Sequence, residues 1–262
     1  MKILIIFFLI GISVSTSAQK KGIVYYGFVD ALINGNANGP DYNAYMTFNL
    51  EQSYYVTAKD SLEDITKKNE TKTYEKAGNT MIANGMAGSP QGNQVVYNLK
   101  QKTIWSNFIF KNQVYVKETA TKLNWKLENE TKKIGSLVCK KATAIFRGRS
   151  FTAWYTPSIP LSYGPWKLNG LPGLILEAYD TNKNLYWYFK SVEYPTKNLE
   201  NVNNLRKQKN EKIKFLTIAE FKEFQIETHE KMKDKIAILQ KKMPNVQFDL
   251  GEKSEIFMEI FE

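Results

Sequence analysis

Short runs rich in Tyr, Phe, Val, Ile and Thr recur along the chain, and clusters of Asn, Gly and Lys separate them. β-Branched and aromatic residues favour the half-buried surface of a strand, whereas the separating residues favour turns. The pattern predicts a mainly β protein of the α+β class, with one curved antiparallel sheet or open barrel and a C-terminal helix. Strands are expected at residues 23–29, 45–50, 53–57, 94–99, 103–109, 113–119, 125–127, 139–146, 150–156, 174–179, 185–192 and 256–260.

A helix is predicted over residues 217–243. Thr217 and Glu220 have the spacing of a capping box, in which each side chain bonds the backbone amide of the other. Pro244 ends the helical pattern, and the segments 247–250 and 256–260 are expected to return to the sheet as strands. One apolar stripe at helical spacing should face the core: Phe221, Phe224, Thr228, Met232, Ile236, Leu239 and Met243.

The first 18 residues have the pattern of an export signal. Lys2 gives a positive start, residues 3–12 are apolar apart from a glycine, and Thr16 and Ala18 suit signal peptidase. The apolar run is about half of the roughly 20 residues that a membrane-spanning helix needs. We therefore expect a mature chain without a transmembrane segment, soluble in the periplasm or associated with the outer envelope.

Residues 19–262 are expected to form a single domain. Within it, the polar stretch at about 60–92 interrupts the strand pattern, which predicts either a mobile loop or a disordered insertion.

Charge and composition exclude several classes of function. The chain has 36 basic and 26 acidic residues, but the basic ones are spread among Glu and Asn as in solvated loops, so no nucleic-acid role is expected. One His and one Cys cannot build a His/Cys zinc site or an internal disulfide. We expect no metal and no cofactor. Because the usual enzyme motifs are also missing from the mature chain, the sequence favours a protein that is not an enzyme.

Two arginines flank a predicted hairpin turn. In Arg147-Gly148-Arg149, the glycine can adopt the positive φ of a tight turn between two strands. The arginines are interpreted either as solvated turn charges or as a clamp for a carboxylate or phosphate. On the second strand Trp154 and Tyr155 should point to opposite faces, and core packing is the preferred interpretation for Trp154.

The loop after this strand contains two further predicted turns. Pro157 and Pro160 end the strand, and Gly164, Pro165 and Trp166 continue as an irregular loop. Asn169-Gly170 favours a two-residue hairpin turn, and Pro172-Gly173 fits the centre of a type II turn. The loop either redirects a strand into the core or forms a rigid rim, in which backbone amides and Trp166 bind an extended ligand.

The next strand ends in two carboxylates. Glu177 interrupts an apolar run and Asp180 follows it. These two residues are the candidates for a hydrolase that uses carboxylates alone, because such chemistry needs neither His nor Cys. The same residue types also suit strand ends and turns.

The run Gly170-Leu171-Pro172-Gly173-Leu174-Ile175 resembles the signature of the GLPGLI family of exported bacterial proteins. The Gly-Arg, Ala-Trp-Tyr and Gly-Pro elements that precede it lie where that family places them. The resemblance implies an envelope location and a β-rich fold in a largely uncharacterised family. It supplies no catalytic residue.

Three functions remain open. The preferred one is an exported, non-enzymatic envelope protein that binds an apolar or extended ligand, because 15 Tyr, 15 Phe and 5 Trp in a β-rich chain can line a concave surface. The first alternative is an interaction module that docks on an outer-membrane protein through the rim at 157–172. The second is the carboxylate-dependent hydrolase.

Overall fold

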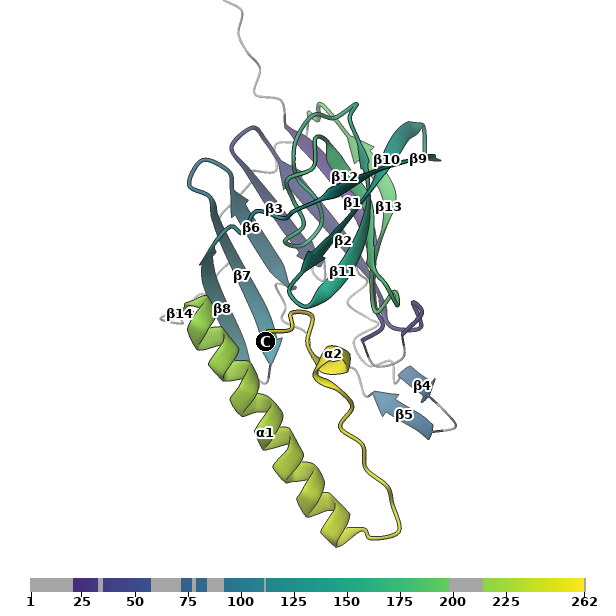
Figure 1. Ribbon diagram of the computed structural model, residues 1–262, viewed down its shortest axis with the longest axis vertical. Helices are drawn as coiled ribbons and strands as arrows, with labels where there is room; N and C mark the ends of the chain where they lie inside the picture. The colour runs from purple at the N-terminus through teal and green to yellow at the C-terminus, as the bar shows by residue number, and fades with distance from the viewer. Residues whose placement is uncertain are drawn as a thin grey trace, which may run out of the picture.

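The computed structural model describes residues 21–32, 35–57, 72–76, 79–83, 92–110, 112–197 and 214–261 (Figure 1). The predicted export signal at 1–18 lies outside the described residues. The structure consists mainly of strands: β1 (Gly22–Asp30), β2 (Asp41–Phe48), β3 (Gln52–Thr57), β4 (Lys72–Lys76), β5 (Asn79–Ala83), β6 (Gln94–Asn98), β7 (Thr103–Phe110), β8 (Asn112–Thr119), β9 (Lys126–Ile134), β10 (Leu137–Phe146), β11 (Arg149–Thr156), β12 (Leu174–Asp180), β13 (Leu185–Glu193) and β14 (Phe215–Leu216). Two helices follow them, α1 (Ile218–Lys242) and α2 (Lys253–Ile256).

Twelve of these strands form one sheet that does not close. Their order is β14-β8-β7-β6-β3-β2-β1-β13-β12-β11-β10-β9, so that β14 and β9 are the two edges. Every pairing is antiparallel except that of β14 with β8. The predicted mainly β fold, a curved antiparallel sheet with a C-terminal helix, is therefore confirmed.

Two strands lie within the polar stretch at about 60–92, where none was predicted. β4 and β5 pair with each other as a separate antiparallel two-stranded sheet.

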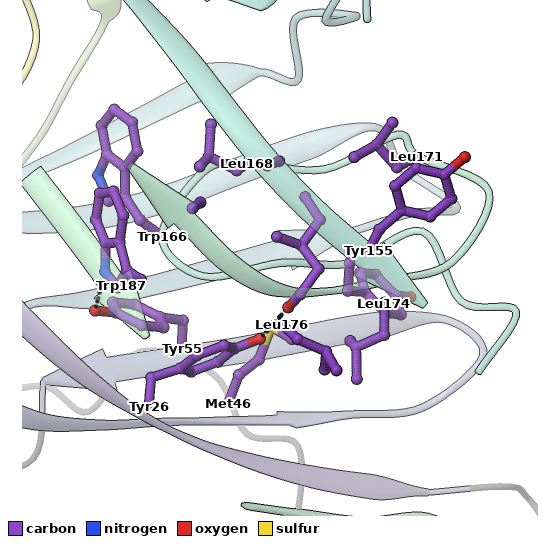
Figure 2. Packing of buried hydrophobic residues seen from close by; sticks show 14 of the residues in the cluster. Tyr26, Met46, Tyr55, Tyr155, Trp166, Leu168, Leu171, Leu174, Leu176 and Trp187 are labelled. Carbon is purple, nitrogen blue, oxygen red and sulfur yellow. Dashed lines mark hydrogen bonds between the residues drawn. The ribbon is translucent and has the colours of Figure 1, made fainter. Parts of the chain in front are cut away.

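Most of the larger buried cluster lies against one face of the sheet, which we call the inner face (Figure 2). A smaller buried cluster lies on the opposite face and includes Ile23, Tyr45 and Tyr54. Tyr26 and Tyr55 are buried on the inner face, and each hydroxyl has a partner. Tyr26 donates to the carbonyl of Ile175 at 2.6 Å, and the indole N–H of Trp187 donates to the Tyr55 hydroxyl at 2.8 Å. These bonds supply the partners that buried polar groups need and tie β1 and β3 to β12 and β13.

Helix α1 begins with the predicted cap and ends as predicted. The Thr217 side chain accepts from the Glu220 amide, and the Glu220 side chain accepts from the Thr217 amide. The apolar stripe is only partly packed, because Phe221 is buried whereas Leu239 and Met243 are 37% and 41% exposed. The helix contacts β8 and β14 and then extends beyond the edge of the sheet (Figure 1). Its second half therefore has no sheet to pack against, and the prediction of one stripe facing the core is wrong there.

The two strands predicted at 247–250 and 256–260 are not present. The chain forms the short helix α2 and then an extended segment outside the sheet ladder. The carbonyls of Ser254, Phe257 and Met258 accept from the side chain of Arg149, which takes the place of a neighbouring strand. We call residues 253–261 the C-terminal segment.

Neither described helix is long and apolar enough to cross a membrane.

Candidate functional site

The turn between β10 and β11 has the predicted tight geometry. Arg147 and Gly148 occupy its two central positions with φ of 50° and 67°. A Cβ atom at Gly148 would lie 2.7 Å from the Cβ of Ile260. Glycine is needed here both for the positive φ and for the close approach of the C-terminal segment.

Arg149 binds a carboxylate and three carbonyls of its own chain instead of an external anion. Its side chain is 5% exposed and pairs with Asp180 at 2.8 Å. Its other N–H groups donate to the three carbonyls of the C-terminal segment at 2.5 to 2.9 Å. Burial lowers the pKa of Arg149, and the adjacent Asp180 opposes this shift. The interpretation as a solvated turn charge is wrong for Arg149, because the C-terminal segment covers it.

Arg147 belongs to a buried group of four charges that we call the buried ion cluster. Lys167 lies between Glu118 and Glu259, at 2.5 and 2.6 Å from their carboxylates. Arg147 pairs with Glu118 and, at 3.1 Å, with Glu259. Burial raises the pKa of Glu259, and Lys167 opposes this shift. The cluster links β8, the turn after β10, the loop at 157–173 and the C-terminal segment.

The loop at 157–173 is packed into the core and does not form an open rim. Leu161, Tyr163, Trp166 and Leu171 are all buried. Trp166 stacks on Trp187 with ring centroids 5.9 Å apart (Figure 2). The rim proposed for a ligand or a protein partner is therefore largely inside the molecule.

Neither predicted turn forms in this loop. No strands flank Asn169-Gly170, and the Gly170 amide donates to the Ser162 carbonyl. The Gly173 amide donates to the Leu171 carbonyl at 2.8 Å, which makes Pro172 the centre of a γ-turn instead of part of a type II turn. Their amides are thus bonded within the chain and do not converge on a ligand.

The predicted Gly164-Pro165 element is likewise buried. A Cβ atom at Gly164 would lie 2.7 Å from a side-chain atom of Ile175, so that a glycine is required by packing.

The interior next to these residues has little free space. A cavity of about 20 Å³ lies beside Trp166 and Met258. Another of about 10 Å³ lies between α1 and the C-terminal segment. Each has room for about one water molecule, so neither can hold a lipid chain.

The candidate carboxylates do not form a pair. Glu177 shares a face of the sheet with its cross-strand neighbour Trp154 and bonds Lys132 at 2.8 Å. Asp180 lies on the opposite face, where it holds Arg149 and accepts from the amides of Asn184 and Leu185. Because successive side chains alternate across a strand, the two groups cannot flank one scissile bond.

Trp154 and Tyr155 are both buried, at 7% and 3% exposed. Core packing of Tyr155 follows from its position on the inner face, near Leu171 and Leu174 (Figure 2). Trp154 is on the outer face, where Lys132 lies 4.4 Å from its ring centre. The two rings thus point to different faces, as expected, and Trp154 belongs to the buried core cluster, in agreement with the interpretation preferred for it.

Three neighbouring tyrosines lie near Trp154 on the outer face, the face opposite the inner one. They were not among the site residues predicted from the sequence. Tyr179 is paired with Tyr186 across β12 and β13, with ring centroids 5.9 Å apart, and Tyr186 is 5.7 Å from Tyr188. We call these three residues the tyrosine row. Each is partly exposed. The alternation of Tyr186 and Tyr188 within a predicted strand is the signal that could have placed them on one face.

Lysines and a carboxylate border the tyrosine row. Lys183 lies 5.4 and 5.3 Å from the ring centres of Tyr179 and Tyr186, and Lys190 lies 5.6 Å from that of Tyr188. The Tyr188 hydroxyl donates to Asp41 at 2.8 Å, and burial together with this carboxylate raises its pKa to about 12. The hydroxyl therefore remains protonated in neutral solution.

The only cysteine and the only histidine of the chain are both buried. Burial raises the pKa of Cys139 to about 11, which leaves it a protonated and unreactive thiol. His229 lies on α1, 3.9 Å from the neighbouring Glu230.

Residues 146–177 match the model of a family described as "Protein of unknown function (Porph_ging)". The matched segment holds the turn arginines, the loop at 157–173 and Glu177. It is the segment on which the resemblance to the GLPGLI family rests, but the match does not carry that name. The resemblance is therefore confirmed only as one to an uncharacterised family.

The chain has no match among curated proteins. Among solved structures it is similar to two crystal forms titled "Structure of PNGF-II", in space groups P21 and C2, with 16% and 17% identity and TM-scores of 0.48. Each similarity covers 79% of this chain but only 33% and 32% of the other. The chain thus spans about a third of the length of those proteins. What the family match establishes is that the chain carries a segment typical of a family of unknown function.

Proposed function

We propose that the protein is an exported, non-enzymatic envelope protein that binds an extended ligand, an acidic polysaccharide chain, on the outer face of β11–β13. The observation that carries this proposal is the tyrosine row. Its central ring, Tyr186, contacts both Tyr179 and Tyr188, so that three partly exposed aromatic rings form a continuous strip on this face.

The chemistry of the tyrosine row matches a sugar chain. A pyranose ring has a C–H face that packs on an aromatic ring, while its hydroxyls need polar partners at the edge. Tyrosine supplies both an apolar body and a hydroxyl. Lys183 and Lys190 have no carboxylate partner among the residues that the structure describes, although Lys190 donates to the side-chain oxygen of Asn43. Their positive charges can therefore attract carboxylate or sulfate groups.

The arrangement of the molecule supports the outer face over the interior. The cavities next to Trp166 and between α1 and the C-terminal segment each have room for about one water molecule. Helix α1 contacts β8 and β14, at the other end of the strand order from β12 and β13 (Figure 1). An extended ligand on the surface therefore fits this fold better than an enclosed apolar ligand. Export rests on the signal pattern of residues 1–18.

Affinity electrophoresis tests the proposal. We expect the mobility of the protein to fall in gels that contain alginate, an acidic polysaccharide, and to change little in gels with neutral dextran. The double variant Tyr179→Ala/Tyr186→Ala should lose most of this retardation, because it removes the apolar strip. Trp105→Ala is the matched control, since Trp105 is also an aromatic residue with a lysine, Lys117, 5.2 Å from its ring centre.

Equal retardation of the wild type and the double variant would overturn the proposal, provided that both are folded by circular dichroism. Retardation that Trp105→Ala abolishes would place binding on another part of the sheet.

A further inference from the structure

The far end of helix α1 carries a group of exposed apolar side chains. Ile238, Leu239 and Met243 are 52%, 37% and 41% exposed, and Val246, just after the helix, is 46% exposed. Soluble proteins expose single apolar side chains commonly, but a group of four within nine residues marks a contact surface. We call residues 231–246 the helix tip.

The helix tip is held in one shape. The Met243 amide donates to the Leu239 carbonyl at 2.9 Å, and the Val246 amide donates to the Met243 carbonyl at 3.1 Å. The Gln240 side chain donates to the Val246 carbonyl at 2.8 Å. These bonds fold the chain back at the end of α1, so that Val246 stays close to the last turn of the helix. Because α1 extends beyond the sheet, its end is the part of this helix farthest from β8 and β14 (Figure 1).

Positive charge surrounds the apolar group. The helix tip contains five lysines and one acidic residue, Asp234. Two of the lysines pair with glutamates of the preceding turn, Lys231 with Glu227 and Lys233 with Glu230. Within the described part of the chain, the other three have no ion-pair partner: Lys235, Lys241 and Lys242.

We infer that the helix tip docks on an anionic lipid surface. Its apolar side chains would enter the boundary between headgroups and acyl chains, and its free lysines would lie at the level of the headgroup phosphates. A helix end with exposed apolar side chains and lysines is the combination that binds such an interface. The helix does not meet the requirements for crossing the bilayer, so the contact is peripheral.

Charge argues against a second copy of the chain as the occupant. Two helix tips brought together would place lysines against lysines with a single aspartate on each side, and like charges disfavour that contact. An anionic headgroup layer complements the same charges. Each lysine near such a surface strengthens binding by about fivefold, and salt weakens this contribution.

Vesicle sedimentation tests the inference with the chain from residue 19 onward. The vesicles contain either phosphatidylcholine alone or about one part phosphatidylglycerol to three parts phosphatidylcholine. We expect the protein to sediment with the anionic vesicles at low salt and to remain in solution with phosphatidylcholine alone. The variants Lys241→Gln/Lys242→Gln and Ile238→Ser/Leu239→Ser should each lower the vesicle-binding constant by about tenfold or more.

Matched controls separate the helix tip from general charge and general stickiness. Lys133→Gln/Lys140→Gln removes two exposed lysines of β9 and β10, and Ile145→Ser removes an apolar side chain that is 79% exposed on β10. Both should bind like the wild type. All of these sites are exposed, and circular dichroism verifies that the variants fold.

Equal sedimentation with neutral vesicles, or full binding by both tip variants, would overturn the inference. A dimer in sedimentation equilibrium that Ile238→Ser/Leu239→Ser dissociates, without lipid binding, would show the helix tip to be a self-association surface instead. These outcomes are independent of the polysaccharide test, because the helix tip comprises the end of α1 and the residues just after it, whereas the tyrosine row lies on β12 and β13.

Discussion

Buried charged side chains in this protein are paired with specific hydrogen-bonding partners. Arg149 is an example, since its five N–H donors can satisfy a carboxylate and several carbonyls at once, which a lysine could not do. Asp30 shows the opposite situation. Burial raises its pKa from 3.8 to about 6, although the Leu32 amide and the more distant Arg149 oppose this shift.

The raised pKa of Asp30 predicts a pH dependence of stability. Between about pH 4 and pH 6 the folded chain holds the proton on Asp30 while the unfolded chain has lost it, so the free energy of unfolding falls as the pH rises through this window. Asp30→Asn removes the titration. We expect the stability of the wild type, measured relative to Asp30→Asn by urea unfolding, to decrease over this window and to level off above it. A difference that stays constant, or that increases with pH, would contradict the burial of this carboxyl group.

Among the secondary-structure elements, those that depend on neighbouring residues alone could be predicted from the sequence. Most strands and the cap of α1 follow from alternation, residue type and the spacing of Thr217 and Glu220. The loop at 157–173 and the C-terminal segment could not be predicted in this way. Their polar groups bond to residues far away in the sequence. Lys167 of the loop, for example, donates to Glu259 of the C-terminal segment, 92 residues later. The buried ion cluster forms no sequence motif for the same reason, because its four residues are far apart in the sequence.

The buried ion cluster should be essential to the docking of the C-terminal segment. Lys167→Met removes the cation between Glu118 and Glu259 and leaves two buried carboxylates close together with Arg147 alone. Breaking a buried pair on one side typically costs about 3–5 kcal/mol. We expect the free energy of unfolding to fall by about that amount, and the C-terminal segment to become more accessible to protease.

Lys133→Met, on an exposed position of β9, is the control for this variant and should change the free energy of unfolding little. A loss of less than about 1 kcal/mol in Lys167→Met would show that the cluster does not hold the segment.

At the scale of the whole molecule, the two faces of the β9–β13 part of the sheet differ in kind. The inner face is filled by the loop at 157–173, the C-terminal segment and the stacked tryptophans, with little space left (Figures 1 and 2). The outer face keeps the tyrosine row partly exposed. Most of the candidate residues taken from the sequence, between Arg147 and Asp180, pack on the inner face. The glycines, prolines, tryptophans and arginines of this segment therefore serve mainly to pack the core. The candidate binding surface follows from register, which places Tyr179 beside Tyr186 only once β12 and β13 are paired.

Hydrogen–deuterium exchange with and without alginate tests polysaccharide binding at the tyrosine row, because it reports where on the chain a ligand binds. We expect slower exchange in β12 and β13, the strands that carry the tyrosine row, and unchanged exchange in the loop at 157–173. Protection confined to that loop or to the C-terminal segment, or no protection in β12 and β13 under conditions where alginate retards the protein, would contradict binding at the tyrosine row.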